Sequence, residues 1–322
     1  MNYRIVVTRW IPESAVEMLR AVGEVQVCQQ DRALEPAELH EAVRGAHAVV
    51  SMVHDRIDAD VVEAAGSQLA VVANVAVGHD DVDVDALANR GVVVTNTPGV
   101  LTDATADLTL GLLLMLTRRL AEGERLLRAR QPWSFHLSFM LGTGLQGKTL
   151  GIVGFGQIGQ AVARRARAFG MSILYTGRNR VAPEVESEFD ARYLPLDELL
   201  GEADVVSLHC PLTEATRHLI DERALGLMKP SALLVNTSRG PVVDELELAR
   251  ALREERIAGA ALDVFEREPQ VEPELLDFDA VVLAPHLGSA TTETRTAMVE
   301  LAARNVVGVL RGEGPATPVG GG

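Results

Sequence analysis

The chain has 322 residues, 47% of them hydrophobic, and a formal net charge of -15 at pH 7. This length is enough for two domains that each have a hydrophobic core. The negative charge argues against broad binding to nucleic acid or to anionic membranes, so an anionic ligand must be captured by local donor groups. We therefore expect a small-molecule ligand, and neither a nucleic acid nor a membrane as partner.

The two cysteines, Cys28 and Cys210, provide no disulfide framework and no metal-ligand spacing, and the eight histidines are scattered along the chain. We therefore predict no metal site. Cys210 follows an apolar run and precedes Pro211, which is typical of a small buried residue. The N-terminal segment reads directly as a strand and has no signal-peptide pattern, so we expect a cytoplasmic protein.

Strands alternate with helices from one end of the chain to the other, which is typical of a parallel α/β architecture. Before residue 100 we predict strands at residues 5–7, 48–52, 69–75 and 92–94. His54 and His79 follow two of these strands, beside the loops that we expect to bind the substrate; we favour a surface role for each, and a role in the site stays open. The next segment, residues 104–119, is apolar nearly all round. It is too short and too interrupted to span a bilayer, so it predicts a buried helix.

A short apolar strand at residues 149–153 leads into a G-x-G-x-x-G turn and then into a helical segment. In such a turn Gly154 permits the tight bend, Gly156 lets the backbone approach a pyrophosphate, and Gly159 lets the helix and strand pack closely. The diphosphate binds the N–H groups at the positive end of the helix dipole. Strand, turn and helix in this order predict a dinucleotide-binding site.

The following strand, residues 172–176, ends in Gly177-Arg178-Asn179-Arg180. An NAD binder usually has an acidic residue here that bonds the ribose 2′-hydroxyl. No carboxylate is present to repel a 2′-phosphate, and Arg178 and Arg180 can neutralise one. We therefore favour NADP(H), while NAD(H) remains possible. In the alternative interpretation both arginines are solvated loop residues.

Three later apolar runs each end near one polar group: Arg239, Glu268 and His286. Strand ends of this kind meet at the carboxyl edge of a sheet, where open α/β folds bind ligands. Arg239 can bind an oxyanion through two N–H groups, and Glu268 can hold His286 as a proton donor near neutral pH. Singly, each is more often a surface or loop residue. Together with the upstream turn, they predict a dehydrogenase site.

Over nearly its whole length the chain resembles the D-isomer-specific 2-hydroxyacid dehydrogenases, and within them most closely the glyoxylate/hydroxypyruvate reductases. The matching motifs are Gly154-Phe155-Gly156-Gln157-Ile158-Gly159, His209-Cys210-Pro211-Leu212-Thr213, Asn236-Thr237-Ser238-Arg239-Gly240, Asp263-Val264-Phe265-Glu266 with Glu268-Pro269, and Pro285-His286 with Gly288-Ser289-Ala290-Thr291. The resemblance implies two Rossmann-like domains with parallel sheets. A dinucleotide-binding domain, residues 101–289, is then inserted into a discontinuous substrate domain, residues 1–100 and 290–322.

The resemblance also implies roles for individual residues. Arg239 matches the arginine that binds the substrate carboxylate and polarises the carbonyl, His286 the acid/base, and Glu268 the carboxylate that favours the protonated imidazole. Val53, Val77 and Gly78 match positions whose backbone N–H groups bind the substrate carboxylate. The residues predicted to bind the cofactor are Thr105, Gly154, Gly156, Gln157, Ile158, Gly159, Arg178, Pro211, Thr237, Asp263 and Gly288.

The implied reaction is the reduction of a small 2-oxo acid to the D-2-hydroxy acid, or its reverse. A D-lactate-like, 3-phosphoglycerate or sugar-acid dehydrogenase remains an alternative, as does an NAD(H)-sensing corepressor-like protein. Phosphite oxidation is disfavoured, because Val77 stands where such enzymes have a lysine. The resemblance further implies a homodimer, in which Trp133 or Phe135 either reaches the partner's site or only anchors the interface. From Gly312 onward we expect a mobile tail.

Overall fold

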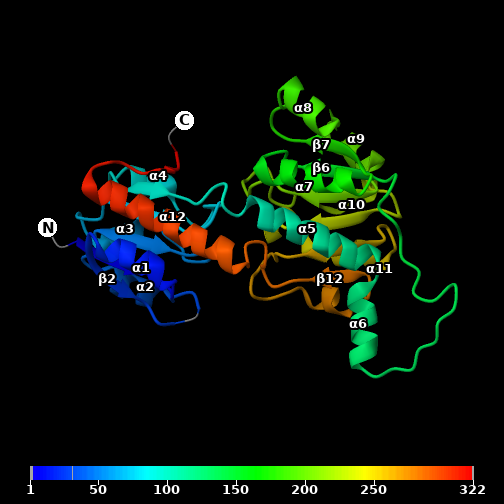
Figure 1. Cartoon of the computed structure of the whole chain (residues 1–322), viewed down its shortest axis with the longest axis horizontal. Helices are drawn as coiled ribbons and strands as arrows, with labels where there is room; N and C mark the ends of the chain where they lie inside the picture. The colour runs from blue at the N-terminus through cyan, green and yellow to red at the C-terminus, as the bar shows by residue number, and fades with distance from the viewer. Residues whose placement is uncertain (1–2, 31, 321–322) are drawn as a thin grey trace. The chain divides into compact units, whose positions relative to one another are not determined.

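The computed structural model describes residues 3–30 and 32–320, and the chain divides into two compact units. The first unit comprises residues 1–101 and 291–322, and the second comprises residues 102–290 (Figure 1). Both units are built on a wholly parallel β-sheet that is covered by helices, which confirms the predicted α/β class. None of the helices in the described ranges has the length and apolarity needed to cross a membrane.

In the described residues, the sheet of the first unit has five strands in the order β2-β1-β3-β4-β5. The strands are β1 (Tyr3–Val7), β2 (Gly23–Val27), β3 (Ala48–Ser51), β4 (Val71–Asn74) and β5 (Val93–Thr95). Every residue of β3 and β4 is buried, as expected for strands covered on both faces. Because all pairs are parallel, the loops that follow the strands lie at one edge of this sheet.

Helices α1 (Glu13–Arg20) and α12 (Thr292–Arg311) pack together on one face of this sheet. The other face is covered by α2 (Pro36–Val43), α3 (Ala59–Ala65) and α4 (Val84–Ala88), whose apolar residues form one cluster with alternate residues of the strands. The side chains of Asp58, Asp83 and Thr291 accept backbone N–H groups at the starts of α3, α4 and α12. Caps of this kind stabilise a helix by about 1 kcal/mol each.

The sheet of the second unit, again within the described residues, has seven strands in the order β12-β11-β10-β9-β6-β7-β8. They are β6 (Thr149–Val153), β7 (Ser172–Thr176), β8 (Ala191–Tyr193), β9 (Val205–Leu208), β10 (Leu233–Asn236), β11 (Gly259–Leu262) and β12 (Val281–Leu283). From β6 the chain proceeds first to one side of the sheet and then to the other. The strand order therefore reverses between β6 and β9, which is where folds of this kind bind ligands.

Helices α5 (Thr102–Thr117) and α7 (Gln157–Ala168) cover one face of this sheet, and α9 (Leu196–Glu202), α10 (Glu222–Leu227) and α11 (Glu245–Arg253) lie on the other (Figure 1). Helix α8 (Pro183–Phe189) and the short 3₁₀ helices η1 (Gly240–Val242) and η2 (Pro273–Asp277) complete the unit. The predicted helix at residues 104–119 is α5, and its leucines are buried or partly buried against the sheet. Phe155 stacks on the fully buried Tyr175, with ring centroids 4.5 Å apart.

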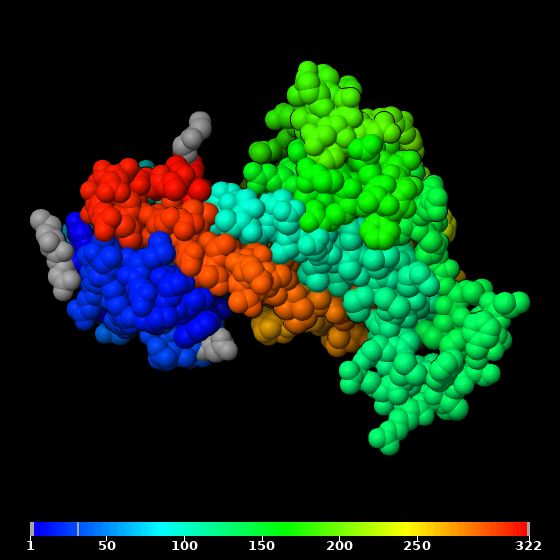
Figure 2. Space-filling model, in the orientation of Figure 1, coloured from blue at the N-terminus to red at the C-terminus, as the bar shows by residue number. Residues whose placement is uncertain are grey.

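Helix α6 (Leu120–Arg128) and the loop after it form an arm, residues 120–141, that extends from the body of the second unit (Figure 2). No residue of α6 is buried. The arm exposes several large apolar side chains: Leu127 is 60% exposed, Trp133 57%, Phe135 81% and Leu137 90%. Trp133 stacks on Phe139 within the arm, so its loop has some structure of its own.

The expectation of a mobile C-terminal tail is wrong for the described residues up to 320. The Thr317 hydroxyl donates to the carbonyl of Asn96 at 2.6 Å, and the Val319 N–H donates to Val94 at 2.8 Å. The fully buried Asn305 of α12 donates to Thr317 and accepts the N–H groups of Ala316 and Thr317. Hydrogen bonds to a buried amide therefore order a tail that has few apolar groups. Residues 321–322 lie outside the described range.

Candidate functional site

The glycine turn joins β6 to α7 with the backbone geometry that its motif predicts. Gly154 has a φ of +97°, and an added Cβ there would lie 2.6 Å from backbone atoms of His209 and Cys210. A Cβ on Gly159 would lie 2.3 Å from the carbonyl oxygen of Gly154. Both positions therefore require glycine, the first for its conformation and for close packing against the loop after β9, the second for close packing of the helix on the turn.

Gly156 differs from the other two glycines, because an added Cβ would meet no atom within 4 Å. It stands at the N-cap of α7, where no side chain caps the helix, and the next residue, Gln157, is exposed. The first N–H groups of a helix are unsatisfied by the helix itself and attract anions. The turn therefore fits a pyrophosphate, and a side chain at residue 156 would occupy the space above it.

The two arginines after β7 have different environments. The Arg180 guanidinium forms a two-pronged ion pair with Glu186, with N–O distances of 2.7 and 2.8 Å, and Glu186 also accepts the Tyr175 hydroxyl at 2.6 Å. Arg180 is the main reason that the pKa of Glu186 is lowered to about 2. Arg178 is exposed and has no side-chain hydrogen bond or ion pair within the described ranges. Of these two arginines, therefore, Arg180 is paired with an acidic side chain and Arg178 is not, as far as the described residues show.

The loop after β9 begins with two groups that are neutral near pH 7. The His209 ring contacts the Ser207 hydroxyl through Nε2 at 2.8 Å, and its buried Nδ1 has no hydrogen-bond partner among the residues that the structure describes. Desolvation lowers the pKa of His209 to about 3 and raises the pKa of the Cys210 thiol to about 11. Cys210 is buried in the core, as expected, and packs against Gly154 of the glycine turn, while Pro211 is exposed. The two residues that begin this loop therefore carry no charge near pH 7.

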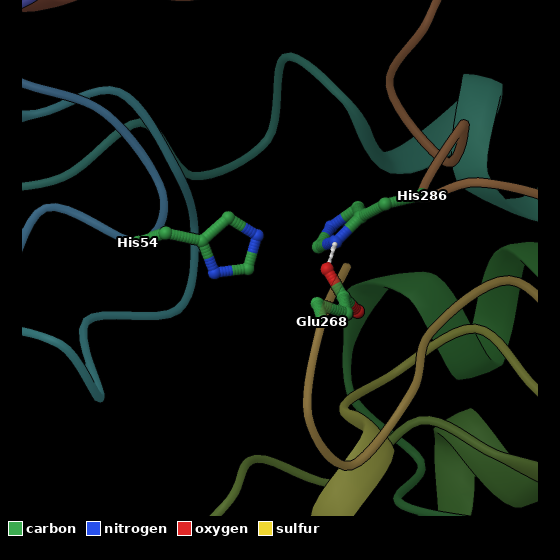
Figure 3. Close-up of side chains that lie close together, drawn as sticks. All are labelled: His54, Glu268 and His286. Atoms are coloured by element: carbon green, nitrogen blue, oxygen red, sulfur yellow. Dashed lines mark hydrogen bonds and ion pairs between the residues drawn. The ribbon is translucent and has the colours of Figure 1, made fainter. Parts of the chain in front are cut away.

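Arg239, Glu268 and His286 follow β10, β11 and β12, which are neighbouring strands. Nδ1 of His286 lies 2.8 Å from Oε2 of Glu268 (Figure 3). The other carboxylate oxygen of Glu268 accepts the N–H of Phe265 at 3.0 Å, which fixes the carboxylate within its own turn. A carboxylate bonded to one ring nitrogen orients the imidazole and leaves the other ring nitrogen for a substrate.

The loop that carries His286 is held in place by hydrogen bonds to the buried carboxylate of Asp263. Asp263 is 1% exposed and accepts the N–H groups of Leu287 at 2.6 Å and Gly288 at 2.8 Å. Its pKa is raised by burial, and these two hydrogen bonds oppose that shift. The Thr105 hydroxyl of α5 donates to the Gly288 carbonyl at 3.1 Å, and Thr109 bonds Thr237 at 2.9 Å. Four of the residues predicted to bind cofactor, Thr105, Thr237, Asp263 and Gly288, thus join α5 to the ends of β10, β11 and β12.

Gly240 connects the Arg239 segment to the turn that carries Glu268. An added Cβ at Gly240 would lie 1.9 Å from the carbonyl carbon and oxygen of Phe265, so the two backbones are in direct contact. The sequence did not reveal two further contacts of this turn. Glu245 accepts the N–H of Glu266 at 2.7 Å, and His218 contacts the Glu266 carboxylate at 2.8 Å. The Asp263-Val264-Phe265-Glu266 motif with Glu268-Pro269 pointed to this turn but not to either of these partners.

In the first unit, Val53 follows β3, and Val77 and Gly78 follow the adjacent β4. Across the described part of the chain, their three N–H groups donate to no other protein group. The Arg9 guanidinium donates to the Val53 carbonyl at 3.0 Å and to the buried Asp55 at 3.3 Å. Asp55 also accepts the N–H of Met52 at 2.8 Å, so this loop is held on both sides of Val53. Arg9 and Asp55 belong to no motif that the sequence revealed.

Comparison with known proteins gives the family of this chain. Residues 110–288 match the family described as "D-isomer specific 2-hydroxyacid dehydrogenase, NAD binding domain". A glyoxylate reductase of Thermococcus onnurineus is 50% identical over 323 aligned residues, which cover 99% of this chain and 96% of that protein.

Solved structures agree with the sequence relatives. A Thermus thermophilus protein is 46% identical, with a TM-score of 0.92 over 98% of this chain and 99% of that one. An NADPH-dependent glyoxylate/hydroxypyruvate reductase of Sinorhizobium meliloti, solved with NADP and malonate, is 35% identical, with a TM-score of 0.86 over 99% and 97% of the two chains. Two parallel-sheet units, a glycine turn of this geometry and full-length relatives lead to one conclusion: this chain belongs to the D-isomer-specific 2-hydroxyacid dehydrogenase family.

Proposed function

We propose that this protein uses NADPH to reduce glyoxylate and hydroxypyruvate to glycolate and D-glycerate. The observation that carries the proposal is the 2.8 Å contact between His286 and Glu268 in the unit whose glycine turn fits a pyrophosphate. A histidine oriented by a carboxylate is suited to general acid–base chemistry at neutral pH. The relatives named glyoxylate reductase support the choice of substrate.

The second unit holds the cofactor in this proposal. Gly154, Gly156 and Gly159 shape the turn for the pyrophosphate, and the first N–H groups of α7 bind its charge. Pro211, Thr237 and Gly288 line the carboxyl ends of β9, β10 and β12 along the rest of the dinucleotide. The reduced nicotinamide supplies the hydride when it is bound. The Asp263 carboxylate accepts the Gly288 N–H and thereby holds the loop of His286 in a fixed position beside the nicotinamide ring.

The substrate carboxylate is bound by Arg239 together with the N–H groups of Val53, Val77 and Gly78. The guanidinium presents N–H groups in a planar fork that matches a carboxylate, and backbone N–H groups bind an anion without a mobile side chain. The contact of Gly240 with Phe265 keeps Arg239 at a constant position relative to the turn that carries Glu268. The same guanidinium polarises the 2-oxo group, which makes the carbonyl carbon a better hydride acceptor.

His286 delivers the proton that the reaction needs. Because Nδ1 contacts Glu268, the proton for the carbonyl oxygen comes from Nε2. Each reduction consumes one proton and each oxidation releases one, so lower pH favours reduction and higher pH favours oxidation. Glu268 compensates the positive charge of the ring during reduction.

The cofactor preference rests on charge at the end of β7. No carboxylate stands at residues 177–180, and Arg178 offers a guanidinium that is not paired with an acid. The Arg180 charge is already compensated by Glu186, which leaves Arg178 to neutralise a 2′-phosphate. This arrangement favours NADPH over NADH.

We also infer that two copies of this chain associate through the arm, residues 120–141. A monomer would expose Leu127, Trp133, Phe135 and Leu137 to water, each more than half exposed. Patches of this kind typically mark protein–protein contacts. Sedimentation of the purified protein at micromolar concentration is expected to give twice the chain mass of 34.6 kDa, and a value equal to the chain mass would reject this inference.

The proposed activity is tested by initial rates of NADPH and NADH oxidation with glyoxylate, hydroxypyruvate and pyruvate. We expect turnover of the first two substrates with NADPH, slower turnover with NADH, and D-glycerate as the product from hydroxypyruvate. Turnover of pyruvate alone would assign a D-lactate-like activity. Cofactor binding without hydride transfer to any of the three substrates would contradict the proposal and indicate a binding protein.

A further inference from the structure

Three consecutive peptide groups after β4 share the same hydrogen-bonding pattern, in which each carbonyl accepts a hydrogen bond from a neighbouring segment. The carbonyl of Ala76 accepts the N–H of Thr97, the carbonyl of Val77 accepts Nδ2 of Asn96, and the carbonyl of Gly78 accepts Nδ2 of Asn74, each at 2.8 Å. Across the described ranges, the N–H groups of the same three peptide units, which belong to Val77, Gly78 and His79, donate to no protein group. Each peptide therefore has a fixed carbonyl and an available N–H.

A fixed carbonyl determines where the N–H of its peptide points. The peptide group is planar and trans, so its C=O and N–H lie on opposite sides of the chain. Holding the Val77 carbonyl through Asn96 therefore directs the N–H of Gly78 away from β5. A hydrogen bond to the carbonyl also polarises the peptide and makes its N–H a stronger donor in a site of low dielectric.

Both asparagines are themselves held in place. Asn74 is the last residue of β4 and is 4% exposed. Asn96 follows β5, and its main chain is bonded on both sides to Thr317: its carbonyl accepts the Thr317 hydroxyl at 2.6 Å, and its N–H donates to the Thr317 carbonyl at 3.3 Å. The C-terminal tail thus fixes the residue that in turn fixes the Val77 peptide.

From this arrangement we propose that Asn74 and Asn96 are positioning residues for carboxylate recognition. They orient and polarise the peptide N–H groups of Gly78 and His79, which bind the carboxylate of a 2-oxo acid together with the N–H of Val77, whose peptide carbonyl is held by the Thr97 N–H. The proposal rests on the proposed function, because the anion it describes is the substrate of that reaction. A purely structural role would make the same two asparagines important for folding but not for substrate affinity.

The test is Asn96→Ala, with Asn89→Ala as the matched control. Asn89 is an exposed residue at the end of α4 in the same unit, and its side chain forms no hydrogen bond within the described residues. Three quantities are measured for each variant: KM and kcat for glyoxylate, KM for NADPH, and the dissociation constant of oxamate from the protein–NADPH complex. Oxamate is an unreactive isostere of a 2-oxo acid, so its binding does not depend on turnover.

We expect Asn96→Ala to raise both the glyoxylate KM and the oxamate dissociation constant about tenfold, the effect of one weakened hydrogen bond to a charged group. The kcat at saturating glyoxylate and the NADPH KM are expected to stay within about twofold of the wild type, and Asn89→Ala to change nothing. Unchanged glyoxylate and oxamate affinity would overturn the proposal. A joint fall in thermal stability, kcat and NADPH affinity, with no selective loss of oxamate binding, would also overturn it.

A second variant covers the case in which Asn96→Ala does not fold. Thr317→Val removes the hydroxyl that holds the Asn96 carbonyl and leaves Asn96 in place. It is expected to weaken oxamate binding about threefold, and unchanged binding would overturn the proposal. If the wild-type protein binds oxamate but reduces none of the three substrates, the proposed function fails, and the positioning of the peptides is still decided by the oxamate measurement.

Discussion

The two units present different chemical groups at the carboxyl edges of their sheets. In the second unit the edge carries ionisable side chains, Arg239, Glu268 and His286, each at the end of one of three neighbouring strands. In the first unit it carries the peptide N–H groups of Gly78 and His79, whose carbonyls are held by Asn96 and Asn74. In the proposed function, proton transfer therefore uses a histidine that can titrate, whereas the substrate carboxylate is bound by a guanidinium and by peptide N–H groups that do not titrate near neutral pH.

The largest effect is expected from His286→Asn, which removes the proposed proton donor. The asparagine keeps a polar group near Glu268 but cannot give a proton, so we expect kcat for glyoxylate reduction to fall about 10²- to 10⁴-fold. Oxamate and NADPH binding should change little, because carboxylate recognition is assigned to other groups. A kcat within threefold of the wild type would show that the proton comes from elsewhere.

Stability in acid tests the sheet edge of the second unit, because this edge carries a buried neutral histidine, His209. Desolvation lowers the pKa of His209 from 6.5 to about 3, so between these values the unfolded chain binds a proton that the folded chain does not. The depressed pKa means that stability is greatest above pH 6.5 and falls as pH drops toward 3. From pH 6.5 to 5 this one group removes about 2 kcal/mol from the free energy of unfolding.

The measurement is urea unfolding at pH 7 and pH 5 for the wild type, His209→Gln and His40→Gln. His40 lies partly exposed in α2, outside the arm, and serves as the control. His209→Gln should lose about 2 kcal/mol less than the wild type on acidification, while His40→Gln should follow the wild type. Equal losses in all three proteins would remove His209 as the source of acid sensitivity.

Arg178→Ala is expected to give the smallest effect of the three. Loss of a guanidinium–phosphate contact should lower kcat/KM for NADPH about tenfold and leave the value for NADH within twofold. The matched control is the double variant Arg180→Ala/Glu186→Gln, which removes the neighbouring ion pair without changing net charge. It should keep the wild-type ratio of NADPH to NADH efficiency. A ratio unchanged in Arg178→Ala would contradict the assignment of that residue.

The parts of this molecule that could be predicted from sequence are those in which a residue type is required by local geometry. The glycine turn is of this kind, because Gly154 and Gly159 leave no room for a Cβ. The strand-end residues Glu268 and His286 were also predicted, since a parallel sheet places consecutive strand ends at one edge. Their direct contact then follows from the adjacency of β11 and β12.

What the sequence did not reveal depends on partners that lie far apart in the chain. The C-terminal tail is ordered by hydrogen bonds to Asn305 and Asn96. The Arg180 guanidinium is paired with Glu186, which also accepts the Tyr175 hydroxyl. The hydrogen bond from the Asn96 side chain to the Val77 carbonyl joins residues 19 positions apart. None of these side chains has a pattern of its own, because an asparagine that fixes a peptide is, in the sequence, like any other loop asparagine.

In the proposed reaction, a hydride and a proton reach the same 2-oxo acid, and His286 is the proton donor. The most direct measurement uses NADPH that carries two deuterium atoms at C4, with hydroxypyruvate as the substrate, and analyses the glycerate by mass spectrometry and chiral chromatography. We expect D-glycerate with one deuterium at C2 from the wild type and at least a hundredfold slower formation by His286→Asn. L-glycerate, glycerate without deuterium, or an equal rate in the variant would contradict it.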